Sequence, residues 1–384
     1  MSGGVTSMPA HQPASPDCLT ITDAPDGLSI TIYENAVPPF VEAAMERLYQ
    51  NLYASVLWLK IMGAAERLHT YVVSEGGLPV TILLFRTNGS RVMVVNNVIQ
   101  ICAAEIGRFS KAIFARFGKV GVISFKTIQT DLTHLDFPYQ RFNTSENIVL
   151  SLPKSADAYV AALGKNTRKN VRYYLNRVKR CFPTFEYKLL ERDKIAEAQV
   201  LDILRLKNNR MLGKPYADTR EDAETRRILK LVAARGMVGV ITIDGRICAG
   251  SIGYRVGNHT FGSVLAHDLQ YDGYWIGMLC CFLTICESIN LGCEEYHFLW
   301  GPDDYKFRML GVQRDLDNVI VYRSPRQVVL NAGVTCTSMA TRCSRLARLR
   351  LREAGKPGNR LGKAMATLLQ WRLKVRERWS LPAK

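Results

Sequence analysis

Alternating apolar and polar positions, interrupted by glycine turns, predict a run of short strands early in the chain. The predicted strands are Thr70–Ser74, Pro79–Arg86 and Arg91–Asn96. A helical period follows over residues 102–117, where apolar residues recur on one face: Ile106, Phe109, Ile113 and Phe117. Gly118 ends this helix, and Val120–Phe125 is predicted to be the next strand.

The same order of elements recurs in the second half. Its predicted strands are Met237–Ile243, Arg246–Arg255 and His259–His267, followed by a helix at Gly277–Leu291 and a strand at Glu295–Trp300. Further helices are predicted before the two meanders: Val37–Tyr53, Lys194–Met211 and Arg220–Arg235. We therefore expect an α+β fold with a mixed sheet, in which two units each place a mostly antiparallel meander before a helix and a parallel-type strand. The two halves are not alike residue by residue, and unrelated α+β proteins also share this order.

A basic helix is predicted between the two repeats. Residues 165–180 hold seven Lys or Arg and no acid, and they carry an apolar stripe at helical spacing: Val171, Tyr174, Leu175 and Val178. Asn166 is expected to cap the start of the helix. Arg168, Arg172 and Lys179 lie away from the stripe. Charge of this kind is usually a solvated face, but a face without acids suggests an anionic partner such as a phosphate, a uronate or an acidic protein.

Two local segments account for the formal net charge of +17. One is the basic helix, and the other is residues 342–384, with 13 Lys or Arg against two Glu. Apolar residues recur in this tail near helical spacing: Leu361, Met365, Leu368, Val375 and Trp379. Such a basic amphipathic helix could contact an anionic membrane surface, dock on the protein itself or bind nucleic acid.

The length of 384 residues suits two domains with tails. We expect a disordered leader (1–26), two folded domains (27–152 and 153–325), of which the second begins with the basic helix, and a basic helical tail (326–384). No apolar run approaches about 18 residues, so no membrane-spanning helix is expected. The first residues do not have the pattern of a signal peptide.

The ten cysteines contain no CxxC pair. Their only cluster is Cys280, Cys281, Cys286 and Cys293, most of which falls in an apolar helical run where cysteine packs as a small hydrophobe. We expect neither a metal site nor disulfides. The expected location is the cytoplasm, with possible peripheral contact at the inner face of the membrane through residues 342–384.

The richest cluster of polar chemistry is Trp300–Arg308, directly after an apolar strand. A Gly-Pro turn there is followed by two carboxylates, a phenol and two cations. Polar groups at a strand end are commonly functional in α/β proteins. The alternative is a surface turn followed by a short charged helix.

These stretches together resemble the GNAT-type acyltransferases. The resemblance lies in LGKNTRKNVRYYLNRVKR, the second meander, the helix after YDGYWIG, and FLWGPDDYKFRMLG. It is greatest for the CelD-like, cellulose-biosynthesis-type subgroup of the FemAB-like tandem-GNAT proteins. It covers roughly residues 155–311, whereas the first half shares only the order of elements.

The resemblance implies a place for the donor and acceptor. A GNAT sheet splays between its fourth and fifth strands, here His259–His267 and Glu295–Trp300, and acetyl-CoA or another acyl-CoA enters the gap. The implied cofactor-binding residues are Val264, Leu265 and Ala266 for the oxyanion, and Gln270, Gly273 and Gly277 for the pyrophosphate at the helix start. Trp275 stands where the family has a small residue, and Asp272 adds negative charge.

Catalytic roles follow from the same resemblance. Tyr305 would protonate the leaving thiolate, and Asp304, or Asp303, would deprotonate the acceptor. His267 is a second candidate base. The expected substrate-binding cations are Arg168, Arg172, Lys306 and Arg308. The alternatives are a packing tyrosine, an N-cap at Asp303, a structural His267 and solvated cations, and His297 receives no role.

The expected activity is transfer of an acyl group to an amine or hydroxyl of an acidic small-molecule or glycan acceptor, in polysaccharide or cell-envelope biosynthesis. An acyl-carrier protein is a further possible partner. The first alternative is a peptidyltransferase that uses aminoacyl-tRNA, the one nucleic acid considered. The second is an inactive GNAT fold that binds through its basic tail.

Overall fold

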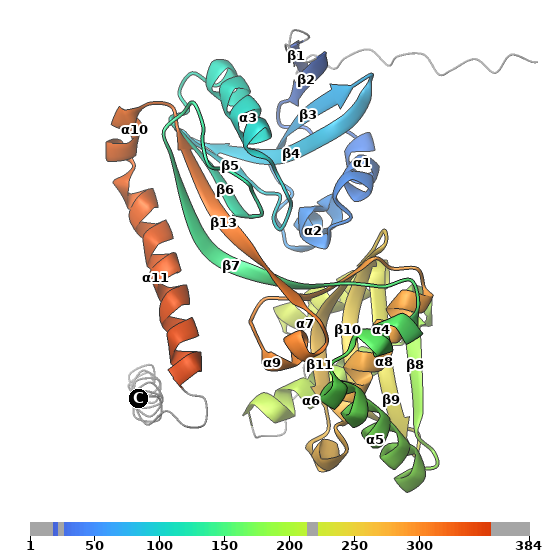
Figure 1. Ribbon diagram of the computed structural model, residues 1–384. Coiled ribbons are helices and arrows are strands. Elements are labelled where there is room, and N and C mark those ends of the chain that lie inside the picture. Colours follow the sequence, from blue (N-terminus) through green and yellow to red (C-terminus); the bar gives the residue numbers. More distant parts are fainter. Residues whose placement is uncertain (1–17, 22–26, 213–221, 355–384) are drawn as a thin grey trace, which may run out of the picture.

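The computed structural model describes residues 18–21, 27–212 and 222–354, whose strands form one 13-stranded mixed sheet (Figure 1). The order across the sheet is β1-β2-β3-β4-β5-β6-β13-β7-β12-β11-β10-β9-β8. The strands are β1 (Cys18–Ile21), β2 (Leu28–Tyr33), β3 (His69–Glu75), β4 (Leu78–Asn88), β5 (Arg91–Val94), β6 (Val122–Ile128), β7 (Tyr139–Ser151), β8 (Glu186–Glu191), β9 (Gly236–Ile243), β10 (Arg246–Val256), β11 (His259–His267), β12 (Glu295–Leu299) and β13 (Val312–Tyr322). The predicted α+β class with a mixed sheet is confirmed.

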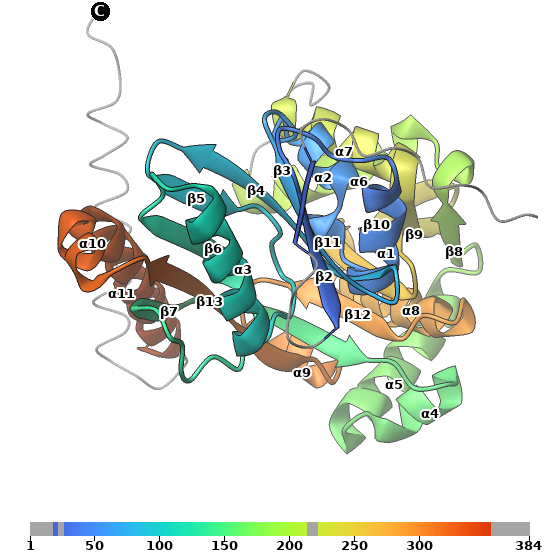
Figure 2. The ribbon, with the colours of Figure 1, turned by 90° about the horizontal axis from the view of Figure 1, so that it is seen from above.

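Helices flank both faces of this sheet. They are α1 (Phe40–Tyr49), η1 (Leu52–Ala54), α2 (Val56–Ile61), α3 (Ala103–Arg116), α4 (Ala156–Ala162), α5 (Lys165–Cys181), η2 (Arg192–Lys194), α6 (Glu197–Leu212), α7 (Ala223–Arg235), η3 (Leu269–Tyr274), α8 (Ile276–Asn290), α9 (Asp304–Arg308), α10 (Pro325–Leu330) and α11 (Ala332–Ala354). In the second half, α6 and α7 contact β10, while α8 lies against β9, β10 and β11 with α4 and α5 outside it (Figure 2).

The two halves repeat one arrangement. In the first, β3, β4 and β5 pair antiparallel, and β5 then pairs parallel with β6 across α3. In the second, β9, β10 and β11 pair antiparallel, and β11 pairs parallel with β12 across α8. The predicted repeat is therefore confirmed.

Helix α8 is buried on nearly every side. Cys280 and Cys281 lie in its apolar core, as the sequence predicted. Each cysteine whose side chain is described is free. Because α8 is fixed between the sheet and α4 and α5, its N-terminal end has a defined position beside β11.

Two long strands, β7 and β13, join the halves and were not predicted. Strand β13 pairs with β6 and β7, and β7 also pairs with β12. Polar residues are buried along them, including Glu146, Asn147 and Asp317, so neither strand shows a clean apolar alternation. The limit at 152/153 stays a prediction, and Figure 1 shows both strands running between the halves.

Several predicted details were wrong. The helix expected at Val37–Tyr53 is interrupted at Gln50, whose φ of 44° is left-handed, and becomes α1 and the start of η1. Gly164, not Asn166, is the N-cap of α5. Strand β1 lies in the segment expected to be a disordered leader.

The beginning of the basic tail forms α10 and α11, and α11 contacts β7. The amphipathic pattern predicted at Leu361 to Trp379 lies outside the described residues. Among the helices that the structure describes, none has the length and apolar character needed to cross a membrane.

Candidate functional site

Strands β11 and β12 separate to form a wedge. They pair only over His259–Phe261 and Glu295–His297. Beyond Phe261, no strand in the described part of the chain pairs with this edge of β11. The backbone N–H groups of that edge, in the segment that holds Val264, Leu265 and Ala266, are therefore available to a ligand. This is where the sequence placed the splayed strands.

The inner surface of the wedge is shaped by a bulge. Gly253 pairs with Gly262 and Ile252 with Val264, so Ser263 is the extra residue of β11. A Cβ at Gly262 would lie 2.7 Å from the Tyr296 hydroxyl. Burial raises the pKa of the Tyr296 phenol well above its ordinary value, so it stays protonated at neutral pH. The sequence analysis gave Tyr296 no role.

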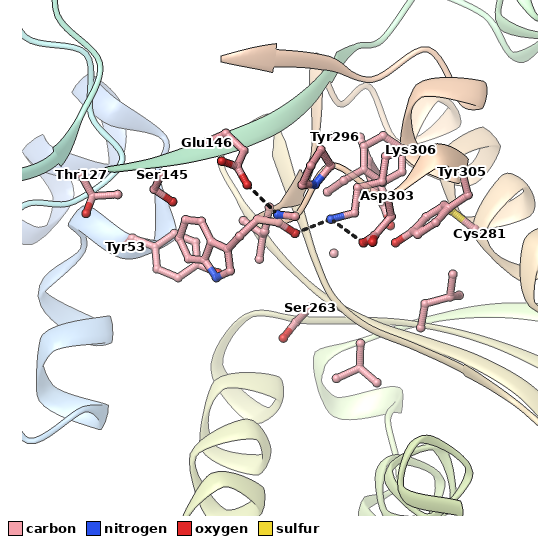
Figure 3. A pocket seen from close by; sticks show the side chains of 18 of the residues that line it. Tyr53, Thr127, Ser145, Glu146, Ser263, Cys281, Tyr296, Asp303, Tyr305 and Lys306 are labelled. Carbon is pink, nitrogen blue, oxygen red and sulfur yellow. Dashed lines mark hydrogen bonds and ion pairs between the residues drawn. The ribbon is translucent and has the colours of Figure 1, made fainter. Parts of the chain in front are cut away.

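A cleft of about 1310 Å³ opens from the wedge. The first half contributes Tyr53, Trp58, Asn97 and Thr127 to its wall, β7 contributes Thr144 to Glu146, and α11 contributes Arg345 and Leu349. Figure 3 shows Asp303, Tyr305 and Lys306 gathered at one end and Tyr53, Thr127 and Ser145 at the other. This volume exceeds the roughly 300–1,000 Å³ of common small-ligand pockets, so the cleft has room for a donor end and an acceptor together.

Lys306 lies inside the cleft rather than on the surface. It is only 3% exposed, its ammonium donates to the Trp300 carbonyl, and it lies 3.6 Å from a carboxylate oxygen of Asp303. The N–H of Gly301 donates to Glu146 across 3.2 Å. The Gly-Pro turn is thereby fixed at both ends, and α9 is held at the mouth of the wedge.

The structure separates the two candidate carboxylates. Tyr305 is half-buried and lines the cleft, with its ring 6.2 Å from that of Phe298. Both carboxylates are exposed, but Asp303 lines the cleft and Asp304 does not. Asp303 occupies the N-cap position of α9, but its side chain makes no capping hydrogen bond there. Asp303 is thus better placed than Asp304 to act on a ligand in the cleft.

A buried ion pair forms part of the wall of the cleft. Arg345 of α11 contacts Glu146 of β7 through Nε at 2.7 Å and Nη2 at 2.6 Å. Arg345 also donates to Asn143. The other cations that line the cleft are paired as well, Lys207 with Glu224 at 3.0 Å and Lys306 with Asp303.

Protein side chains occupy the space beside the loop that was predicted to bind pyrophosphate. A Cβ on Gly277 would lie 2.6 Å from Nδ1 of His267, so the imidazole occupies the space beside the first turn of α8. His267 Nε2 lies 2.6 Å from Asp272, which places a carboxylate there. Trp275 is the left-handed N-cap of α8, with φ of 59°. This loop does not fit a CoA pyrophosphate as Gln270, Gly273 and Gly277 were expected to hold it.

The basic helix α5 borders the same loop. Arg177 donates to the Gly273 carbonyl at 3.2 Å, and its guanidinium lies 4.7 Å from the Tyr274 ring centre. Arg168 donates to the Ala161 carbonyl, and Arg172 is exposed. The buried stripe of Val171 and Val178 confirms the predicted apolar face.

The expected site residues therefore fall into two groups. Those that line the cleft are Val264, Leu265, Tyr305 and Lys306. Those that do not are Asp304, Ala266, His267, Gln270, Gly273, Gly277, Arg168, Arg172 and Arg308. Ala266 is fully buried in the core.

Comparisons with known proteins agree with this geometry. Residues 165–307 match the acetyltransferase (GNAT) domain. The solved structure of FemX covers 77% of this chain and 99% of its own, with 10% identity and a TM-score of 0.55. A conserved protein of unknown function from Bacteroides thetaiotaomicron covers 76% of this chain and 100% of its own, with 13% identity and a TM-score of 0.51. No curated protein sequence matches the chain. Identities this low show the fold alone, and the fold is a tandem GNAT arrangement.

Proposed function

We propose that the chain is an acyltransferase whose reaction takes place where the wedge opens into the cleft. The observation that carries this proposal is the separation of β11 from β12 beyond Phe261, with Tyr305, Lys306 and Asp303 at its mouth. The free edge of β11 offers N–H donors to a developing oxyanion, and such preorganised donors often supply the largest catalytic term.

The chemistry assigns a role to each side chain at the mouth. An amine or hydroxyl of the acceptor attacks the acyl carbonyl and loses its proton to Asp303, the carboxylate that lines the cleft. The Tyr305 phenol gives a proton to the leaving group of the donor. Lys306 holds Asp303 and the Trp300 carbonyl in place, and its positive charge favours the oxyanion.

The donor is proposed in two forms. An acyl-CoA is the donor that the GNAT domain favours, and it would have to bind away from the filled loop. An aminoacyl-tRNA is favoured by the His267–Asp272 pair beside Gly277, by the acid-free face of α5, and by the size of the cleft. The second form makes the protein a FemAB-like peptidyltransferase.

The acceptor and the location of the protein are further parts of the proposal. We infer an acidic acceptor such as a glycan precursor or a lipid head group, a CelD-like role in polysaccharide or cell-envelope synthesis, and an acyl-carrier protein as a further partner. The protein would act in the cytoplasm, with residues 342–384 in peripheral contact with the inner face of the membrane.

The donor is tested with the full chain and a Gly273→Trp variant. A Cβ at Gly273 meets nothing within 4 Å, so a side chain can begin there without a clash and extend over the loop. Acetyl-CoA binding that survives in the variant would support the acyl-CoA form, with the donor bound away from this loop. Binding of aminoacyl-tRNA that survives in the variant, with a steep salt dependence, would support the second form. Binding of neither donor would refute the proposal.

The catalytic role is tested with Tyr305→Phe. Loss of a general acid should lower kcat by about 10²-fold or more with little change in KM. Tyr173→Phe, on the exposed face of α5, is the matched control and should leave kcat unchanged. An unchanged kcat in Tyr305→Phe would remove Tyr305 from the reaction.

A further inference from the structure

Strand β12 presents a second cluster on the face opposite the wedge. Tyr296 and Phe298 line the cleft, while Glu295 and His297 line a separate cavity of about 460 Å³. His259 pairs in register with Glu295 at the start of β11 and lines the same cavity. Two imidazoles and a carboxylate thus meet on one face of the only stretch where β11 and β12 are joined in the described chain.

The three side chains converge on a single point. His297 Nε2 lies 3.1 Å and His259 Nδ1 4.0 Å from the same oxygen, Oε2 of Glu295. The three candidate ligand atoms all lie within 4.8 Å of one another. Two atoms bound tetrahedrally to one ion at about 2.1 Å lie about 3.4 Å apart, so the widest pair has to close by about 1.4 Å or less.

His297 has a buried nitrogen that the protein leaves unsatisfied. The residue is 4% exposed, and its Nε2 makes no well-formed hydrogen bond, although it lies 3.1 Å from Oε2 of Glu295. The ring is held by stacking on Phe261, at 4.4 Å between centroids and 15° between planes. An orphaned ring nitrogen that is fixed in direction and faces two further ligands is what a metal ion would satisfy.

The other nitrogen of His297 has the supporting partner that metal-binding histidines have. Nδ1 lies 2.9 Å from the side-chain amide of Asn147, whose own oxygen has no partner. A half-turn of that amide exchanges its oxygen and nitrogen and lets Nδ1–H donate to the oxygen. Nε2 then carries the lone pair that faces the cluster, as second-shell partners of ligating histidines arrange it.

Glu295 is oriented by Arg314. The shorter contact, 2.6 Å from Nη2, is to Oε1, whereas Nη1 lies 3.1 Å from Oε2. The arginine thus fixes the carboxylate with Oε2 as the oxygen nearest to the two imidazoles. The cavity beside them is lined by Asn51, Gln100 and Gln129, so a further coordination position would face a polar space.

We propose that His259, Glu295 and His297 bind a divalent transition-metal ion of the zinc class. Two imidazoles, one carboxylate and an open position form a ligand set that zinc uses, and imidazole disfavours magnesium and calcium. The ion would join β11 to β12 directly before they diverge. It would also anchor the first half, because Gln50 of that half accepts from the N–H of Asn258, the residue directly before His259.

The proposal is tested on the full, untagged chain after treatment with a chelator. We expect one Zn²⁺ per chain by equilibrium dialysis, and a visible Co²⁺ spectrum without a thiolate charge-transfer band, because the site contains no cysteine. His259→Gln and His297→Gln should each weaken binding at least tenfold. His134→Gln, at an exposed histidine, is the matched control and should bind normally.

A buried histidine can also fail for structural reasons, so the variants are compared by circular dichroism without metal. His259 is the less buried of the two, and its variant is expected to fold. Wild-type protein that binds no Co²⁺ or Zn²⁺ would overturn the proposal. So would a charge-transfer band, or undiminished binding by a folded His259→Gln variant.

Discussion

Replacing Arg345 with methionine removes the cation that holds α11 against β7. Its guanidinium makes two short contacts with Glu146, and both side chains are about 10% exposed. Methionine keeps most of the volume but leaves the Glu146 carboxylate buried with only the Gly301 N–H as a donor. Removal of one partner of a buried ion pair costs about 3–5 kcal/mol, so we expect the free energy of unfolding to fall by an amount in that range.

That range is an upper limit, because α11 can detach and allow water to reach Glu146. If detachment costs less than burial of the lone carboxylate, urea unfolding shows a smaller loss. Arginines of α11 then become accessible to trypsin. The assay therefore combines urea denaturation with timed trypsin digestion of the same samples, and either a loss above about 2 kcal/mol or rapid cleavage within α11 is expected.

Two variants isolate the ion pair from other effects. Arg342→Met, at an exposed position of the same helix, should change stability by no more than about 0.5 kcal/mol. Glu146→Gln combined with Arg345→Met removes both charges and should recover part of the loss. An Arg345→Met protein with a stability change under about 1 kcal/mol and no faster cleavage would refute the buried ion pair.

Two further changes test the wedge and the first-half core. Gly262→Ala should lower the free energy of unfolding in urea by about 1–3 kcal/mol, because its Cβ would meet the Tyr296 hydroxyl. Tyr296→Phe should relieve this clash. Additive losses of unfolding free energy in the double variant would contradict the reasoning. Burial raises the pKa of Glu105, which accepts from Tyr71, so the folded state keeps this proton to higher pH than the unfolded chain. The stability it contributes is present at low pH and lost as pH rises through the folded pKa, so Glu105→Gln should gain stability relative to wild type as pH rises above about 4.5 in urea titrations.

The sequence predicted the repeat because its strands and helices carry regular apolar periods. β11 was predicted at its observed limits, and α3 and α8 within about one or two residues of theirs. The long strands β7 and β13 lack such a period, since Glu146 and Asp317 are buried in them. Burial of those acids depends on Arg345 and Arg141, which come from distant segments and cannot be recognised from local pattern.

The site was predictable only where a residue follows directly from a strand end. Tyr305 and Lys306 lie at the cleft because the Gly-Pro turn delivers them there. The loop at Gln270 to Gly277 was expected to bind phosphate, but His267 packs on Gly277 from the end of β11. That contact depends on how far α8 lies from β11, which spacing along the chain does not determine.

Strand β7 was not predicted because it contains buried polar residues, and the contacts of these residues explain why they are polar. Successive residues of a strand face opposite sides of the sheet, and Glu146 and Asn147 are successive. Glu146 faces the cleft, where it fixes Gly301 and Arg345, while Asn147 faces away and supports His297. A strand whose polar side chains make contacts on both faces of the sheet cannot show an apolar alternation. Since β7 also pairs with β12 and β13, movement of either polar partner would shift the wedge and the proposed ion site together.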